Sequence, residues 1–217
     1  MLVEVSKIFD KSKDFFNNLY IMQEKDISEY SVCLAEAFKG YVLFEYLSGG
    51  SYDIEKMTKF WEVSIRTSFK SLLGISADEK TSSVILLKEN CSDSTSVFEY
   101  IKHGGLKFFK LFGIKNTLNI MNFENFAEKI KNKYTTKNCT YLLAFATRPE
   151  MCGKGYGSSV MKPVLEYLDK TGQDCYLETL KEYNVALYEH FGFELKETAV
   201  VPNTDMKLYA MLRKYNK

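Results

Sequence analysis

The feature that most constrains the fold is a strand, a glycine-rich turn and a helix in immediate succession. The run from Tyr141 to Thr147 is apolar and aromatic, so it predicts a buried β-strand. Glycines follow at positions 153, 155 and 157, and the apolar residues Val160, Val164 and Leu168 then recur at helical spacing. This order predicts a turn whose backbone is exposed at the start of a helix.

A turn of this kind can bind an anion. The first N–H groups of a helix have no intrahelical partner and lie at the positive end of its dipole. Glycine leaves them accessible, and Lys154 adds a positive charge. A Walker loop is excluded, because G-x-x-x-x-G-K-[ST] does not occur. A dinucleotide fingerprint is weakened because Ser158 replaces its third glycine, but Glu178, about twenty residues on, leaves it open.

Two linked motifs resemble those of the GCN5-related N-acetyltransferases, the GNAT family. The turn resembles the acetyl-CoA loop [QR]-x-x-G-x-[GA], except that Cys152 stands in the first position. The segment 184–193, NVALYEHFGF, resembles the family's N-x-x-[LF]-Y-x-x-x-G-F ending. The resemblance implies an α/β (α+β) GNAT fold, in which a mixed, twisted central sheet with splayed central strands is flanked by helices.

The resemblance also implies where acetyl-CoA binds. In this family the pantetheine arm lies between two diverging strands and bonds to exposed backbone, as an added strand would. Carried over residue by residue, these backbone contacts fall on Phe145, Ala146 and Thr147. The pyrophosphate falls on the turn, which comprises Cys152, Gly153, Lys154, Gly155, Tyr156, Gly157 and Ser158. Asn184 would bond the pantetheine arm, although a helix N-cap is an alternative role for it.

Two residues are candidate catalysts. Tyr188 matches the family tyrosine that protonates the departing thiolate, and a phenol with a pKa near 10 can exchange a proton with a thiol whose pKa is near 8.5. Glu178 is the best-placed carboxylate to take a proton from the acceptor amine. Tyr141 is a weaker candidate for that base, and a water chain to solvent would need neither. His103 is expected to be an ordinary loop residue.

The rest of the chain predicts one domain spanning residues 1–217, since repeats, low-complexity tracts and linkers are missing from the sequence. Residues 1–18 are expected to be an appended segment. A strand at 19–23 and a helix capped by Asp26 or Ser28 and ended by Gly40 should follow. Helices are expected in 41–72 and 97–133, on the acceptor side. The remaining predictions are a hairpin of 73–77 with 83–87 and a closing hairpin after Phe193.

Composition limits the partners and the compartment. Lysine and arginine number 29 against 28 acidic residues, which indicates neither a nucleic-acid nor a membrane partner. Five cysteines without a C-x-x-C pair, together with only two histidines, favour reduced thiols and no metal site. We therefore expect a cytoplasmic protein with no signal peptide or membrane span, and a homodimer is left open.

Within the family, the chain most resembles the puromycin N-acetyltransferase subgroup. The residues that carry this resemblance are Leu177–Thr179, Asn184, Tyr188 and Pro163. It implies an acyltransferase that moves an acetyl group from acetyl-CoA to the primary amine of a small molecule, by direct attack in a ternary complex. Two alternatives stay open. The chain could acetylate a protein or peptide amine, or it could bind acetyl-CoA without catalysis.

Overall fold

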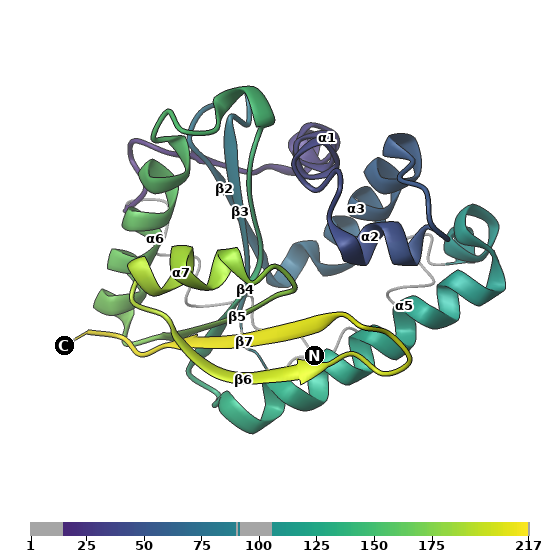
Figure 1. Cartoon of the computed structure of the whole chain (residues 1–217). Coiled ribbons are helices and arrows are strands. Elements are labelled where there is room, and N and C mark those ends of the chain that lie inside the picture. Colours follow the sequence, from purple (N-terminus) through teal and green to yellow (C-terminus); the bar gives the residue numbers. More distant parts are fainter. Residues whose placement is uncertain (1–14, 90, 92–105, 217) are drawn as a thin grey trace, which may run out of the picture.

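The computed structural model describes residues 15–89, 91 and 106–216. Within these residues, seven strands form one mixed sheet in the order β1-β2-β3-β4-β5-β7-β6 (Figure 1). The strands are β1 (Tyr20–Ile21), β2 (Leu72–Ser76), β3 (Ser83–Lys88), β4 (Cys139–Thr147), β5 (Asp174–Thr179), β6 (Glu194–Val200) and β7 (Lys207–Arg213). This arrangement confirms the predicted mixed α/β sheet.

Every neighbouring pair of strands is antiparallel except β4 and β5, which are parallel. That parallel pair is short, since it is registered only at Cys139–Asp174, Thr140–Cys175 and Tyr141–Tyr176. Beyond these residues β4 continues to Thr147 and β5 continues to Thr179, but the two strands no longer pair with each other. The centre of the sheet is therefore open at one end, as the prediction of splayed strands required.

Helices cover both faces of the sheet, as Figure 1 shows. On one side lie α6 and α7, and on the other lie α1, α2, α3 and α5. Their bounds are α1 (Ile27–Ala37), α2 (Val42–Leu47), α3 (Ile54–Ser68), α5 (Leu106–Tyr134), α6 (Tyr156–Thr171) and α7 (Tyr183–His190). Gly113 interrupts α5 with a φ of 76°, which kinks this helix.

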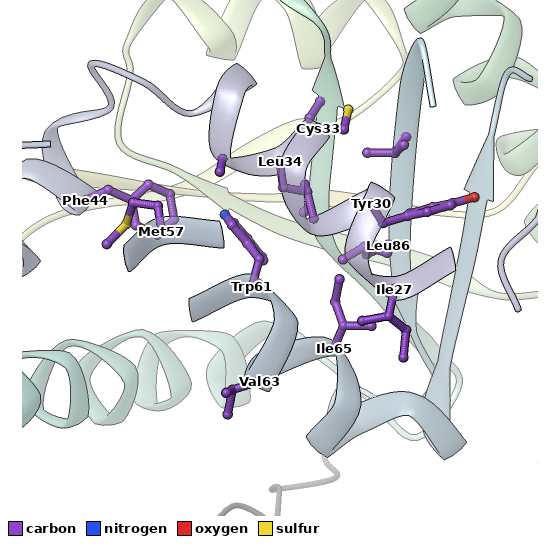
Figure 2. Close-up of a cluster of buried hydrophobic side chains, with 14 of the residues drawn as sticks. Ile27, Tyr30, Cys33, Leu34, Phe44, Met57, Trp61, Val63, Ile65 and Leu86 are labelled. Carbon is purple, nitrogen blue, oxygen red and sulfur yellow. The ribbon is translucent and has the colours of Figure 1, made fainter. Parts of the chain in front are cut away.

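The core is divided by the sheet. On the α1 and α3 side, a cluster that includes Tyr30, Leu34, Met57 and Trp61 packs against β3 and β4 (Figure 2). On the other side, the apolar stripe of α6 packs against β3 and β5, with Val160 and Val164 fully buried. The stripe predicted for α6 is thus confirmed, and Pro163 lies inside that helix. A third cluster joins α5 to β5 and β7.

The predicted elements correspond to observed ones with two local corrections. The predicted side-chain cap of α1 is wrong, because the Asp26 carboxylate accepts hydrogen bonds from the Gln23 N–H and the Tyr20 hydroxyl instead. Gly40 also follows the end of α1 by three residues. Both hairpins are confirmed. The first 14 residues of the predicted appended segment, and residues 97–105 of the predicted helical region, lie outside the described residues.

Candidate active site

The opening between β4 and β5 has a local cause in β4. Leu86 pairs with Ala144 and Leu87 pairs with Leu142, so Leu143 is the extra residue of a β-bulge. A bulge bends its strand and increases the local twist. It lies just after Tyr141, the last β4 residue paired with β5. The bulge therefore turns β4 away from β5 and leaves backbone of residues 142–147 free of β5.

The turn after β4 has the conformation that its glycines predict. Gly153 and Gly155 have φ values of 75° and 86°, in the left-handed region that side chains disfavour. A Cβ added to either would meet nothing within 4 Å, so the backbone conformation is what requires glycine at these two positions. Gly157 differs, because an added Cβ would lie 3.0 Å from Cζ of Phe145. That glycine lets α6 pack closely on β4.

The start of α6 is open to a ligand. Gly155 is the N-cap residue of α6, and no side chain caps this helix. The first N–H groups of α6 are therefore not bonded to a capping side chain. Lys154 is exposed beside them. The donors and the positive charge match the chemistry of a diphosphate.

Cys152, which departs from the family motif, does not offer its N–H freely. That N–H donates to the Pro149 carbonyl at 3.3 Å, while the thiol lies 3.5 Å from the Arg148 carbonyl oxygen. The side chain is exposed, unlike the buried Cys33, Cys91 and Cys175. Cys152 thus closes the short 3-10 turn at Pro149–Met151 and leads into the glycines. The Lys154 N–H likewise donates to the Met151 carbonyl at 3.4 Å, so both N–H groups already have acceptors within the turn.

A cavity of about 110 Å³ lies at the divergence of β4 and β5. The sheet contributes residues 142–145 from β4 with Glu178 and Thr179 from β5, and α7 contributes Asn184 and Tyr188. The rest of the lining is aromatic and runs from the C-cap of α1 through α2 into α3, namely Phe38, Tyr41, Phe44 and Trp61. The stretch from β4 to α7 and the distant segment 38–61 therefore meet around one space that contains a carboxyl, an amide and hydroxyl groups.

Glu178 is held by the strand beside it. The Tyr141 hydroxyl donates to Oε2 of Glu178 at 2.7 Å. Burial raises the pKa of Glu178 from 4.5 to about 7, although the Tyr141 hydrogen bond and the charge of Lys131 both act to lower it. Burial, and then the charge of Glu178, raise the pKa of Tyr141 well above its usual range. Glu178 is accordingly the better proton acceptor near neutral pH, and Tyr141 is its hydrogen-bond donor.

Tyr188 and Asn184 enter the cavity from successive turns of α7. Tyr188 is buried and its ring packs on Phe193 at a centroid distance of 5.7 Å. Its burial raises the pKa of its hydroxyl, which keeps that hydroxyl protonated. Asn184 donates through Nδ2 to Oγ1 of Thr179 at 3.0 Å. The N-cap of α7 is Glu182, so the alternative that Asn184 caps this helix is wrong.

The sequence analysis did not name Thr179 as a site residue, and Thr179 lies beside Tyr41 of the aromatic wall. Oγ1 of Thr179 accepts from Asn184 and lies 3.4 Å from the Tyr41 hydroxyl. The Tyr41 hydroxyl in turn accepts the Leu180 N–H at 2.7 Å. Tyr41 therefore ties the aromatic wall to the end of β5. No sequence signal identifies this contact, because Thr179 and Leu180 follow Tyr41 by 138 and 139 residues in the chain.

The aromatic residues of 41–72 divide into two groups. Tyr41, Phe44 and Trp61 belong to the buried core cluster and also line the cavity, so core packing and cavity lining are not exclusive roles here. Phe60 and Phe69 pack around the same cluster without lining the cavity. Phe38, the C-cap residue of α1, joins the cavity wall.

Arg148 connects the two sides of the site. It follows β4 directly, and its guanidinium binds Glu36 of α1, Glu29 of α1 at 2.8 Å and the Thr81 hydroxyl at 2.8 Å. Its side chain is only 12% exposed. The start of the glycine turn is thereby fixed to α1, whose C-cap residue is Phe38 of the cavity wall.

The predicted site residues fall into two places along β4. Phe145, Glu178, Asn184 and Tyr188 line the cavity. The turn residues 152–158 lie beyond the end of β4, and Ala146 and Thr147 connect the two places. His103 lies outside the described residues. In the described part of the chain, His, Cys, Asp and Glu form no group of three that could hold a metal, and no helix has the length and apolarity to cross a membrane.

Comparison with known proteins identifies the fold. Residues 119–193 match the model of the Acetyltransferase (GNAT) family. An uncharacterized N-acetyltransferase of Schizosaccharomyces pombe is 29% identical over 68 residues, which are 31% of this chain and 28% of that protein. The chain thus matches less than a third of the length of this curated relative.

Two solved structures resemble nearly the whole chain. One, from Corynebacterium glutamicum, is described as histone acetyltransferase HPA2 and related acetyltransferase, and it superimposes with a TM-score of 0.63 at 18% identity, over 92% of this chain and 97% of that one. Drosophila melanogaster polyamine N-acetyltransferase, which forms N-acetylagmatine, gives 0.59 at 11% identity, over 90% and 99%. The fold is therefore the GNAT fold.

Proposed function

We propose that this protein is an acetyl-CoA-dependent N-acetyltransferase whose acceptor is a primary amine of a small molecule. The observation that carries the proposal is the cavity between β4 and β5, which brings Glu178 and Tyr188 together at the opening of the sheet. The family match over residues 119–193 supports the same chemistry.

The proposed acetyl-CoA site runs along β4 to the turn. Residues 145–147 pair with β3 but not with β5, and their backbone on the β5 side would hydrogen-bond the pantetheine arm. The open N-terminus of α6 would bind the diphosphate. Asn184 is held by Thr179 at the cavity and would bond the same arm. The thioester supplies an activated acetyl group, so the protein needs only to position it and to move protons.

Glu178 is the proposed base. A primary ammonium must lose a proton before its nitrogen can attack a carbonyl carbon, and a carboxylate whose pKa is about 7 can accept that proton near neutral pH. Tyr188 is the proposed acid. As the carbon–sulfur bond breaks, its phenol would donate a proton to the departing thiolate and later regain one from solvent. The amine ends as an amide, and the acetyl group changes partner without redox chemistry.

The enclosed aromatic wall supports a small acceptor. A cavity of about 110 Å³ has the scale of the cavities, on the order of 150 Å³, that accept one aromatic ring. This is the feature that favours a puromycin-type small-molecule enzyme over a protein acetyltransferase, which needs an open groove for a chain. Acetylation of a peptide amine and acetyl-CoA binding without catalysis are the competing proposals.

One experiment separates the three. The protein is incubated with acetyl-CoA and either small primary amines or peptides with free N-terminal and lysine amines. Acetylated product is measured by mass spectrometry, because the exposed Cys152 would itself react with thiol reagents. Products from small amines support the proposal, and products only from peptides replace it. Calorimetric binding of acetyl-CoA without product would indicate a binder, and no binding of acetyl-CoA would refute all three proposals.

A further inference from the structure

Lys131 brings a positive charge close to the proposed base. It lies near the end of α5, the helix that packs against β5 and β7. Its ammonium is 5.1 Å from the centroid of the Tyr141 ring, which is a cation–π contact. The hydroxyl of the same ring donates to Oε2 of Glu178 at 2.7 Å. One side chain, Tyr141, therefore contacts both the cation and the carboxyl.

The charge of Lys131 is not neutralised by another acidic side chain. Among the residues that the structure describes, no carboxylate lies within ion-pair distance of its ammonium. Lys133, two residues further along α5, differs because it binds Glu197 of β6 at 2.9 Å. An uncompensated charge acts on its surroundings over several ångströms, and that of Lys131 acts on Glu178. The two lysines therefore have different partners, although they leave the same helix end.

Lys131 is the cation that acts directly on Glu178. The titratable groups around this carboxyl are Tyr141 on β4, Tyr176 on β5, Tyr41 before α2, Tyr188 on α7 and Lys131 on α5. Ala210, its paired neighbour on β7, is uncharged. Lys181 lies over the Tyr41 ring instead, at 5.3 Å from its centroid. The charge of Lys131 lowers the pKa of Glu178, against the effect of burial.

This arrangement suits a base that works inside a cavity. Burial favours the neutral carboxyl, which cannot take a proton from an arriving ammonium. The Tyr141 hydroxyl and the Lys131 charge both favour the carboxylate. Since the hydroxyl that binds Oε2 belongs to the ring under Lys131, the same contacts also restrict the direction of the carboxylate.

We propose that Lys131 is a positioning residue, which acts through Tyr141 to keep Glu178 ionised and fixed in orientation while the acceptor amine binds. Lys131 is not among the residues that line the cavity, so its effect reaches the reacting groups only through Glu178. This inference rests on the proposed function and adds to it a residue from outside the cavity.

The first test is the pH profile of kcat/KM in Lys131→Met, which keeps an unbranched side chain and removes the charge. The wild-type profile should rise through about pH 7, and the rise should move by about 0.5–1 pH unit to higher pH in the variant. Its kcat/KM should then be about two- to fivefold lower at pH 7 and close to wild type near pH 9. Lys131→Arg keeps the cation and should retain the wild-type profile. An unchanged profile in Lys131→Met would overturn the proposal.

Two controls test whether Lys131 acts through Glu178. Lys133→Met removes the neighbouring lysine that binds Glu197, and it should leave the profile in place. Lys131→Met added to Glu178→Gln should change the profile no further. If it lowers kcat/KM equally with and without the Glu178 carboxyl, Lys131 acts elsewhere and the positioning role is refuted.

Unfolding by denaturant gives a readout that needs no turnover. Because folding raises the pKa of Glu178 to about 7, the wild type should lose stability relative to Glu178→Gln as pH rises, and the loss should end near pH 7. With Lys131→Met in both proteins, the loss should continue for about 0.5–1 pH unit further.

The two readouts separate this inference from the proposed function. If the stability curve shifts and no amine is acetylated, Lys131 acts on Glu178 as inferred and the catalytic proposal fails. If amines are acetylated with a profile that depends on Glu178, and neither that profile nor the stability curve moves in Lys131→Met, the positioning role is refuted and the function stands.

Discussion

The two walls of the cavity are assembled differently. The wall made by β4, β5 and α7 comes from one continuous stretch, residues 139–190, and its chemistry is visible as motifs. The aromatic wall comes from residues 38–61 and is held by contacts such as that between Tyr41 and Leu180, which lie 139 residues apart. The wall of β4, β5 and α7 would bind acetyl-CoA and catalyse the transfer, and the aromatic wall would bind the acceptor amine. Substitutions in the first wall should therefore change kcat or acetyl-CoA affinity, and substitutions in the second should change the KM for the amine.

The largest effect is expected for Tyr188→Phe, in the motif-bearing wall. Loss of the phenolic proton should lower kcat by about 10²–10³-fold while acetyl-CoA affinity changes by less than about threefold. Steady-state kinetics and calorimetry measure the two quantities. Tyr183→Phe, on the exposed face of the same helix, is the matched control. Equal losses of kcat and affinity in Tyr188→Phe would contradict its role as the acid.

Gly155→Val should weaken acetyl-CoA binding by about 100-fold, because a β-branched residue opposes the left-handed conformation that opens the start of α6. Gly172→Val is the control, since Gly172 has a φ of 69° at the other end of α6. It should reduce stability by a similar mechanism and leave the affinity intact. Calorimetry measures the acetyl-CoA affinity of both variants. An unchanged affinity in Gly155→Val would refute the proposed position of the diphosphate.

Glu178→Gln should lower kcat/KM by about 10–100-fold at pH 8 and change its pH dependence. The pKa of Glu178 is about 7, so the carboxylate form of the wild type increases as pH rises through 7. Activity should rise over the same range, and this limb should disappear in the variant. Glu189→Gln, exposed on α7, should keep the limb. A variant that keeps the wild-type limb would favour a water chain instead.

The same substitution has a stability signature of opposite sign. Because folding raises the pKa of Glu178 from 4.5 to about 7, the folded state binds more protons than the unfolded state between these pH values. The wild type should therefore lose stability as pH rises from 4.5 to 7. Glu178→Gln removes that loss and should be the more stable protein at pH 8 by about 1–3 kcal/mol, but not at pH 4. Denaturant unfolding at both pH values provides the measurement.

The smallest effect is expected in the aromatic wall. Tyr41→Phe leaves the Leu180 N–H without its acceptor, which should lower the free energy of unfolding by about 1–2 kcal/mol. The KM for the amine should rise while the Kd for acetyl-CoA stays constant. Tyr46→Phe, a partly buried tyrosine of α2 in the same cluster, is the control. A rise in the Kd for acetyl-CoA instead would mean that the aromatic wall also contributes to cofactor binding.

The sequence predicted the elements and the motif-bearing wall because their signals are local. The apolar run before Pro149, the glycines of the turn and the stripe of α6 each follow from spacing within a few residues. Glu178 and Tyr188 could be named for the same reason, through motifs at a fixed separation. The roles proposed for them remain predictions.

The rest depended on contacts that no spacing encodes. The bulge at Leu143 arises from pairing with β3, and Thr179 lies beside Tyr41, which is 138 residues away in the chain. Aromatic residues of 41–72 look alike in sequence, yet only Tyr41, Phe44 and Trp61 of them reach the cavity. Which aromatic ring faces a ligand is a property of packing among helices, and local composition does not report it.

The Arg148 cluster carries a consequence for how the two substrates bind together. Arg148 lies between β4 and the glycine turn, and its guanidinium binds Glu36 of α1. Glu36 is two residues before Phe38 of the cavity wall. A ligand that repositions the turn therefore shifts a helix bearing part of the acceptor wall. Linkage then requires that any tightening of amine binding by acetyl-CoA be matched by equal tightening of acetyl-CoA by the amine. Because this coupling is reciprocal, it favours joint occupancy of the two sites and does not by itself impose an order of addition.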